Sequence, residues 1–198
     1  MPPRKNPYAK PDRFTRAAKD AGFPARSVFK LEEIDRRVRL LRPGMRVLDL
    51  GAAPGSWALY AARKIGHGKI LAVDLEPLRI SLPPNASFVQ GDAISIDNAD
   101  LGGLAPYDVV LSDMAPKTTG NRITDQTRSY DLFMRALAIA GTFGARGGSF
   151  VGKIFMSDDL PLARTEVRRL YDGERLVRPE GTRAVSTEIF VIGTGKRV

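Results

Sequence analysis

Two residues of opposite charge each come directly after an apolar segment that has the composition of a buried strand. Asp113 follows the segment VVLS at 109–112, and Lys153 follows FVG at 150–152. Opposite charges at the same rim of a parallel sheet are costly to desolvate unless they pair, so we expect these side chains to meet. An amine and a carboxylate at a cleft can hold a hydroxyl group and take its proton. The alternative is a plain ion-pair network that fastens the rim of the sheet.

Two further charged residues are candidates for the same site. Lys30 lies early in a helix-like segment, and Glu188 stands at the start of an apolar strand-like segment. If the fold brings all four residues together, the site contains two lysines and two carboxylates. Either carboxylate can then orient a lysine.

A glycine-containing loop follows the first strand-like segment. The strand VLDL at 47–50 runs into GAAPGS at 51–56, and a helix opens at about Trp57. In open α/β sheets a ligand binds outside the carboxyl ends of the strands, and glycine lets the backbone approach it. The dinucleotide fingerprint G-x-G-x-x-G fails because Ala53 replaces the second glycine. The loop therefore favours a ligand without a pyrophosphate.

Acidic residues after the next strands resemble the nucleoside-binding pattern of class I methyltransferases, whose cofactor is S-adenosylmethionine. Asp74, at the end of the second strand, can accept hydrogen bonds from ribose hydroxyls, and Asp92 is placed to accept one from the adenine amino group. Each of these residues could instead cap a turn. Trp57 is interpreted as a further cofactor contact, the alternative being an ordinary core residue of its helix.

The elements that must position these residues alternate along the chain. Helices are expected at 12–21, 27–41, 57–65, 127–143 and 158–171, and strands at 46–50, 69–74, 87–90, 107–112 and 149–154, followed by two β-rich segments. Apolar strands favour burial on both faces. We therefore predict a single α/β domain over residues 1–198, with a mainly parallel central sheet flanked by helices on both faces.

Composition excludes several kinds of site and indicates the class of binding partner. The 198 residues contain no Cys and one His, which excludes disulfides, Cys-ligated zinc and two-His metal sites. Residues 1–46 carry a net charge of +8 out of +9 for the chain, so a polyanion such as RNA is the expected partner, a solvated basic tail being the alternative. No signal peptide or membrane span is recognisable. We expect a cytoplasmic protein without metal or membrane partner, a monomer, with residues 1–25 forming a basic, partly flexible extension.

Longer motifs resemble the FtsJ/RrmJ (RlmE) family of ribosomal RNA 2′-O-ribose methyltransferases, from about residue 26 to near the end of the chain. The matching segments are RSVFKL at 26–31, DLGAAPG at 49–55, SDMAP at 112–116, GGSFVGK at 147–153 and STE at 186–188. The family's usual PGGW is PGSW here, with Ser56 in place of glycine, and the segment after Pro116 reads KTTG. The resemblance implies a Rossmann-like class I methyltransferase fold.

The resemblance also implies site roles. A catalytic Lys-Asp-Lys-Glu tetrad falls on Lys30, Asp113, Lys153 and Glu188. The cofactor contacts fall on Gly51 and Gly55, on Trp57, and on Asp74, Asp92 and Asp113.

A mechanism follows from this tetrad. A ribose 2′-hydroxyl is a weak nucleophile, so the protein must deprotonate and align it for in-line attack on the cofactor methyl group. Lys153 is the candidate base. Burial and the second cation Lys30 favour its neutral form, while Asp113 opposes this and is expected to orient Lys153 and stabilise the sulfonium. Glu188 would restrain a lysine by pairing.

The sequence thus predicts an S-adenosylmethionine-dependent 2′-O-methyltransferase acting on ribosomal RNA, expected to modify a uridine of 23S rRNA during ribosome assembly. The alternatives are a non-catalytic RNA-binding assembly factor and an NAD-dependent oxidoreductase. The assembly factor would not need Lys153 or Asp113, and the oxidoreductase would need the missing fingerprint.

Overall fold

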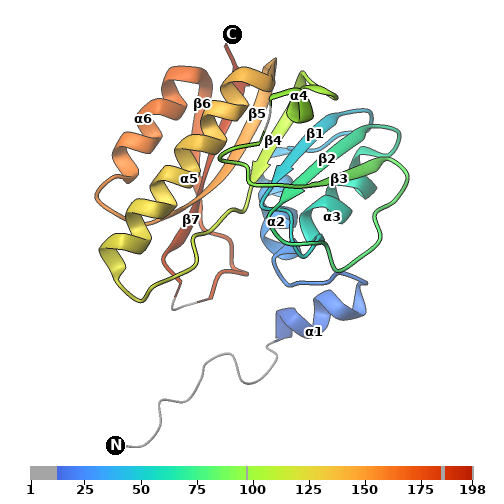
Figure 1. Cartoon of the computed structure of the whole chain (residues 1–198), viewed down its shortest axis with the longest axis horizontal. Helices are drawn as coiled ribbons and strands as arrows, with labels where there is room; N and C mark the ends of the chain where they lie inside the picture. The colour runs from blue at the N-terminus through green and yellow to red at the C-terminus, as the bar shows by residue number, and fades with distance from the viewer. Residues whose placement is uncertain (1–12, 97, 184–185, 198) are drawn as a thin grey trace, which may run out of the picture.

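A computed structural model of the chain describes residues 13–96, 98–183 and 186–197. In this part of the chain, strands form one seven-stranded sheet in the order β3-β2-β1-β4-β5-β7-β6 (Figure 1). The strands are β1 Arg46–Leu50, β2 Lys69–Asp74, β3 Ala86–Gln90, β4 Tyr107–Ser112, β5 Gly144–Phe155, β6 Tyr171–Val177 and β7 Glu188–Lys196. Strands β1 to β5 pair in parallel, and β7 is antiparallel to both β5 and β6. The predicted mainly parallel sheet is confirmed.

Helices cover both faces of this sheet (Figure 1). They are α1 Arg13–Asp20, α2 Val28–Val38, α3 Ser56–Ile65, α4 Asn98–Gly102, α5 Arg122–Phe143 and α6 Leu160–Leu170. Side chains of α2 and α3 pack with Val109 and Leu111 of β4 in one apolar cluster, whereas side chains of α4, α5 and α6 pack with Val110 in a second cluster. Successive residues of a strand point to opposite faces, so a strand apolar on both faces belongs to both clusters.

Most predicted elements lie where the sequence placed them, and the differences have local causes. The strands at 46–50, 69–74 and 107–112 agree with β1, β2 and β4 to the residue. Helix α5 begins five residues before the predicted 127, because the side chain of Asn121 caps it by accepting a hydrogen bond from the Thr124 amide at 3.1 Å. Strand β5 begins at Gly144 rather than 149, in glycine-rich sequence that β-propensity disfavours. The short α4 was not predicted.

The antiparallel β7 is the feature of the fold that most affects the site. Parallel strands bring their carboxyl ends to one edge of the sheet, but β7 runs the other way and brings its first residues to that edge. In the register of β5 with β7, Phe155 pairs with Glu188. Glu188 therefore lies at the same edge as Asp113 and Lys153, which follow or end parallel strands.

The basic N-terminal segment is only partly within the described residues. Helix α1 packs beside α2, and the rings of Phe14 and Phe29 lie 5.8 Å apart. Residues 1–12, which belong to the predicted extension at 1–25, lie outside the described residues. None of the described helices combines the length and apolar composition of a membrane span.

Candidate active site

A cavity of about 630 Å³ opens at the carboxyl edge of the parallel strands. Four of the predicted cofactor residues line it: Gly51 after β1, Asp74 at the end of β2, Asp92 after β3 and Asp113 after β4. Apolar wall residues come from the same loops, and Leu75 and Ile94 are more than half exposed there. The cavity thus combines carboxylate acceptors with apolar surface, as a nucleoside requires.

The glycine loop brings backbone close to this cavity. Gly51 has a φ of 77°, and its amide donates to the Val73 carbonyl at 2.9 Å. A Cβ at this position would lie 2.8 Å from the Met114 backbone nitrogen. Glycine is therefore required at residue 51 both by its backbone conformation and by the close approach of the loop after β4.

The carboxylate of Asp74 is fixed by the loops on both sides of it. Its Oδ2 accepts from the Ala53 amide at 2.8 Å, and its Oδ1 accepts from the Glu76 amide at 2.8 Å. Each carboxylate oxygen can accept a further hydrogen bond, so Asp74 retains capacity for a hydroxyl donor. Asp92 is held in a similar way, because its Oδ1 accepts from the Ile94 amide at 2.9 Å.

Two predicted cofactor residues do not line the cavity. Gly55 forms the N-cap of α3, and a Cβ there would meet Ile80 rather than the cavity. The Trp57 indole is buried, with its ring 5.7 Å from that of Phe190 and its Nε1 donating to the Ser27 carbonyl at 2.8 Å. The helix turns Trp57 away from the loop and toward α2. The Trp57 side chain therefore packs in the core, and a cofactor contact by this residue stays a prediction that its backbone would have to fulfil.

The four predicted tetrad residues form two ion pairs. The Nζ of Lys153 lies 2.9 Å from Oδ1 of Asp113, and it also donates to the Asp113 backbone carbonyl. Lys30 pairs with Glu188, and both side chains are 12% exposed. Lys153 is more deeply buried, at 7%. The fold thus gathers residues from α2, β5, β7 and the loop after β4 at one rim.

A second cavity of about 320 Å³ lies on the other side of the Lys153–Asp113 pair. Its wall contains Lys153, Glu188, Arg183 and Asp125. A third cavity shares Glu188 and Arg183 with it and adds Lys30 and Arg26. Sequence analysis gave no role to Arg26 or Arg183. Arg26 lies within the RSVFKL motif and could have been noticed there. No motif in the sequence indicates Arg183, because only the loop between β6 and β7 brings it to the site.

Arg26 and Arg183 line the same cavity, and the Arg26 guanidinium also donates to the Gly181 carbonyl. Burial and the charge of Arg183 lower the pKa of the Arg26 guanidinium from its usual value, while Glu188 raises it. Two guanidinium groups beside a lysine make this part of the site attractive to an anion.

Ser56 and Trp57 tie the glycine-loop helix to the segment that carries Lys30. The Ser56 hydroxyl donates to the Ala25 carbonyl at 3.0 Å and accepts from the Ala25 amide at 2.8 Å. Ser56 is fully buried, and the Trp57 bond to Ser27 lies one turn before Lys30. The residue that departs from the family's usual glycine therefore has a structural role in this chain. It fixes the start of α2 against α3.

Asp49 is a buried carboxyl group beneath the glycine loop. It is completely inaccessible to solvent, and neither of its oxygens meets a side-chain hydrogen-bond donor among the described residues. Burial raises its pKa well above the usual value, and the negative charges of Asp113 and Asp74 raise it further. The nearby backbone amide of Ala58 lowers it by less. The Asp49 carboxyl therefore holds its proton more strongly than an ordinary aspartate does.

Comparison with known proteins gives consistent results. Residues 23–196 match the FtsJ-like methyltransferase family. A protein of Sorangium cellulosum named ribosomal RNA large subunit methyltransferase E is 64% identical over 194 residues, which cover 98% of this chain and 92% of the relative. A protein of the same name from Bdellovibrio bacteriovorus is 46% identical, over 96% of this chain and 99% of the relative.

A similar fold occurs in a crystal structure of a Plasmodium falciparum protein described as a ribosomal RNA methyltransferase. The two structures superimpose with a TM-score of 0.78 at 21% identity, over 88% of this chain and 98% of the other. At that identity the likeness concerns the fold alone.

Proposed function

The chain belongs to the FtsJ-like methyltransferase family, and we propose that this methyltransferase uses S-adenosylmethionine to methylate a ribose 2′-hydroxyl of large-subunit ribosomal RNA. One observation carries the proposal. The Lys153–Asp113 pair stands between two cavities, with Asp113 in the wall of the larger one and Lys153 in the wall of the smaller one. An amine is thus placed where a nucleophile in one cavity would meet a methyl donor in the other.

The larger cavity fits the cofactor. Its volume of about 630 Å³ is that of a typical small-molecule site. Asp74 would accept from the ribose hydroxyls and Asp92 from the adenine amino group, while Leu75 and Ile94 offer apolar surface to the adenine ring. When bound, S-adenosylmethionine supplies an electrophilic methyl group on a sulfonium. The Asp113 carboxylate favours that positive charge.

The smaller cavity would hold the target ribose, and its residues supply the proton chemistry. The neutral amine of Lys153 accepts the proton of the 2′-hydroxyl. The deprotonated ribose oxygen would be the nucleophile, and S-adenosylmethionine, held by Asp74, Asp92 and Asp113, would supply the methyl group while its sulfur keeps the bonding electron pair. Asp113 orients Lys153 through the 2.9 Å contact with its side chain and through its backbone carbonyl. The proton on Lys153 afterwards passes to solvent.

Lys30 and Glu188 would hold the ribose rather than take its proton. Their ion pair is exposed to the second and third cavities, which share Glu188. The ion pair holds both side chains in place beside these cavities. We therefore assign Lys30 and Glu188 positioning and electrostatic roles.

The substrate assignment rests on charge and on the relatives. Arg26 and Arg183 give the third cavity the character of a phosphate site, and the excess positive charge lies in residues 1–46. The relatives at 64% and 46% identity carry the name ribosomal RNA large subunit methyltransferase E. We propose that residues 1–198 act as one catalytic domain in the cytoplasm, with residues 1–25 contributing to RNA binding and a uridine of 23S rRNA as the target.

Transfer of a labelled methyl group tests the proposal. The protein is incubated with methyl-labelled S-adenosylmethionine and either free large-subunit rRNA or isolated large subunits. We expect label on one ribose, which makes the adjoining phosphodiester resistant to alkali because the 2′ oxygen can no longer attack it. Label on a base, or RNA binding without transfer, would contradict the proposal. The second result would favour the non-catalytic assembly factor.

A further inference from the structure

Five arginines line a groove at the edge of the sheet opposite the active site, which we call the arginine groove. It consists of two adjoining cavities of about 320 and 280 Å³ that share Val38, Arg39 and Thr194. Arg42 and Arg146 line the first cavity, and Arg37 and Arg175 line the second. These residues come from the end of α2 and the turn after it, from β5 and from β6.

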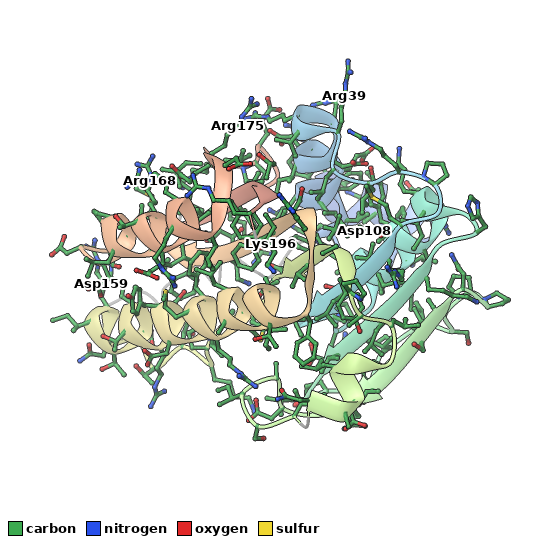
Figure 2. The ribbon with its side chains drawn as sticks, turned by 90° about the horizontal axis from the view of Figure 1, so that it is seen from above. Arg39, Asp108, Asp159, Arg168, Arg175 and Lys196 are labelled. Carbon is green, nitrogen blue, oxygen red and sulfur yellow. The ribbon has the colours of Figure 1, made fainter. Side chains whose placement is uncertain are left out.

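The groove is far from the reaction centre. A strand rises about 3.3 Å per residue, so Arg146 near the start of β5 lies about 20 Å from Lys153 near its end. Figure 2 looks onto the molecule from above and labels Arg39, Arg175 and Asp108, and Arg39 and Arg175 line the same cavity. A group bound in the groove therefore cannot be the ribose that reacts.

Most of the groove arginines have no carboxylate partner. Within the described ranges, Arg39, Arg42, Arg146 and Arg175 form no ion pair, and Arg37 pairs with Glu33 of its own helix. Arginines on the neighbouring α6 differ, because Arg164 and Arg168 both pair with Glu174.

One carboxylate does line the groove, and it is already engaged. Oδ2 of Asp108 accepts from the Arg46 amide at 2.7 Å. The groove therefore keeps a net positive charge that an anionic ligand would neutralise.

Buried hydrogen bonds fix the turn that carries Arg39 and Arg42. The carboxylate of Asp35 accepts from the Leu41 amide at 2.8 Å and from the Tyr60 hydroxyl at 2.9 Å. The Arg39 amide donates to the Asp35 carbonyl at 2.7 Å, with Arg39 in the left-handed conformation. The backbone of this turn is thus already ordered, so an anion that binds here would have to order only the arginine side chains.

We propose that the arginine groove binds the phosphate backbone of a second segment of the RNA substrate, away from the nucleotide that is methylated. Guanidinium groups suit this ligand because each can contact a phosphate through two hydrogen bonds. Contacts to phosphate carry no information about the base, so the groove would contribute affinity and orientation rather than sequence selectivity. The inference rests on the proposed function only in naming the RNA as ribosomal.

RNA binding by paired variants tests the groove directly. The probe is protein-free large-subunit rRNA, and its Kd is measured without cofactor over a series of KCl concentrations. The variants are R39Q/R175Q and R42Q/R146Q. The matched control is R63Q/R169Q, which removes two exposed arginines of α3 and α6 that line neither cavity. The unfolding temperature of each variant shows whether the fold is intact.

We expect both groove variants to bind the RNA about tenfold more weakly at ~0.1 M salt. The slope of log K against log salt should also become less steep by about 1 to 2, because a variant that contacts fewer phosphates releases fewer counterions on binding. The control should change less than twofold. Groove variants that behave like the control would overturn the proposal.

Two further results distinguish a failure of the groove proposal from a failure of the proposed function. If the groove variants lose affinity for whole large subunits but keep it for protein-free rRNA, the groove meets an acidic ribosomal protein and the RNA assignment is wrong. If the wild-type protein transfers no methyl group to rRNA, the proposed function fails. The binding series still decides the groove, because it needs no catalysis.

Discussion

Lys153 Nζ and Asp113 Oδ1 lie 2.9 Å apart at the rim of the sheet, although the two residues are 40 positions apart in the chain. Asp113 faces the larger cavity and Lys153 faces the smaller one. Because one ion pair contacts both cavities, a change in either residue should affect transfer. Only a change in Asp113 or in the loops of the larger cavity should affect cofactor binding.

Replacing Asp74 with alanine should weaken S-adenosylmethionine binding by about 10- to 100-fold, the effect of losing hydrogen bonds to a charged acceptor. Calorimetric titration measures the Kd. The matched control is Asp108→Ala, which also removes an aspartate that accepts from a backbone amide but lies at the opposite edge of the sheet. Equal affinities for wild type and Asp74→Ala, or tighter binding of NAD than of S-adenosylmethionine, would refute the cofactor assignment.

Ser56→Ala should slow methyl transfer while leaving the cofactor Kd nearly unchanged. The variant loses both bonds to Ala25, and with them the attachment of the α2 segment that carries Lys30. Leaving the Ala25 amide buried without a partner should also lower the free energy of unfolding by about 1 to 3 kcal/mol. Single-turnover rates and urea unfolding give the two quantities.

The control for Ser56 is Tyr107→Phe, which removes a buried hydroxyl that donates to the Leu101 carbonyl at 2.6 Å, far from α2. It should lower stability without slowing transfer. A Ser56→Ala enzyme with the wild-type rate would show that this attachment does not position Lys30.

Asp49→Asn should change how stability depends on pH. Burial holds the folded-state pKa of Asp49 well above the ordinary aspartate value of 3.8, so between that value and the folded-state pKa the folded protein binds more protons than the unfolded one. The free energy of unfolding of the wild type therefore falls as pH rises through this window, by up to about 1.4 kcal/mol per pH unit from this one group. The asparagine variant lacks this slope.

Denaturant unfolding of both proteins from pH 5 to pH 8 measures the difference. The wild type should lose stability relative to Asp49→Asn as the pH increases. A constant difference across the range would mean that Asp49 titrates near its ordinary pKa despite its burial.

The sequence predicted the candidate site best where a local residue pattern and the sheet topology place a side chain at the same edge. Asp113 and Lys153 follow apolar segments, and the carboxyl ends of parallel strands share an edge, so their meeting could be predicted from spacing alone. The position of Glu188 depends on β7 running antiparallel between β5 and β6. Apolar periodicity does not give strand direction, so the pattern offered Glu188 only as a candidate, and the motif resemblance supplied its role in the tetrad.

Features that depend on helix rotation or on distant loops were not predictable. Trp57 follows the glycine loop directly, but the start of α3 at Ser56 turns its ring toward Phe190 and α2. The arginine groove combines residues of α2, β5 and β6, and β6 is separated from β5 by β7 in the sheet. In the sequence these arginines look like ordinary exposed charges, and only the sheet order brings them together.

The pH dependence of single-turnover methyl transfer by Lys153→Arg tests the central claim most directly. Arginine keeps the positive charge beside Asp113 but cannot be deprotonated in proteins, so it separates a base from a purely electrostatic group. If Lys153 takes the ribose proton, the wild type has a base at this position and the arginine variant has none. The arginine variant should then be slower by about 10²- to 10⁴-fold at every pH, with nearly unchanged cofactor affinity. A Lys153→Arg enzyme that transfers methyl groups at close to the wild-type rate would contradict the account and show that the ribose proton leaves by another route.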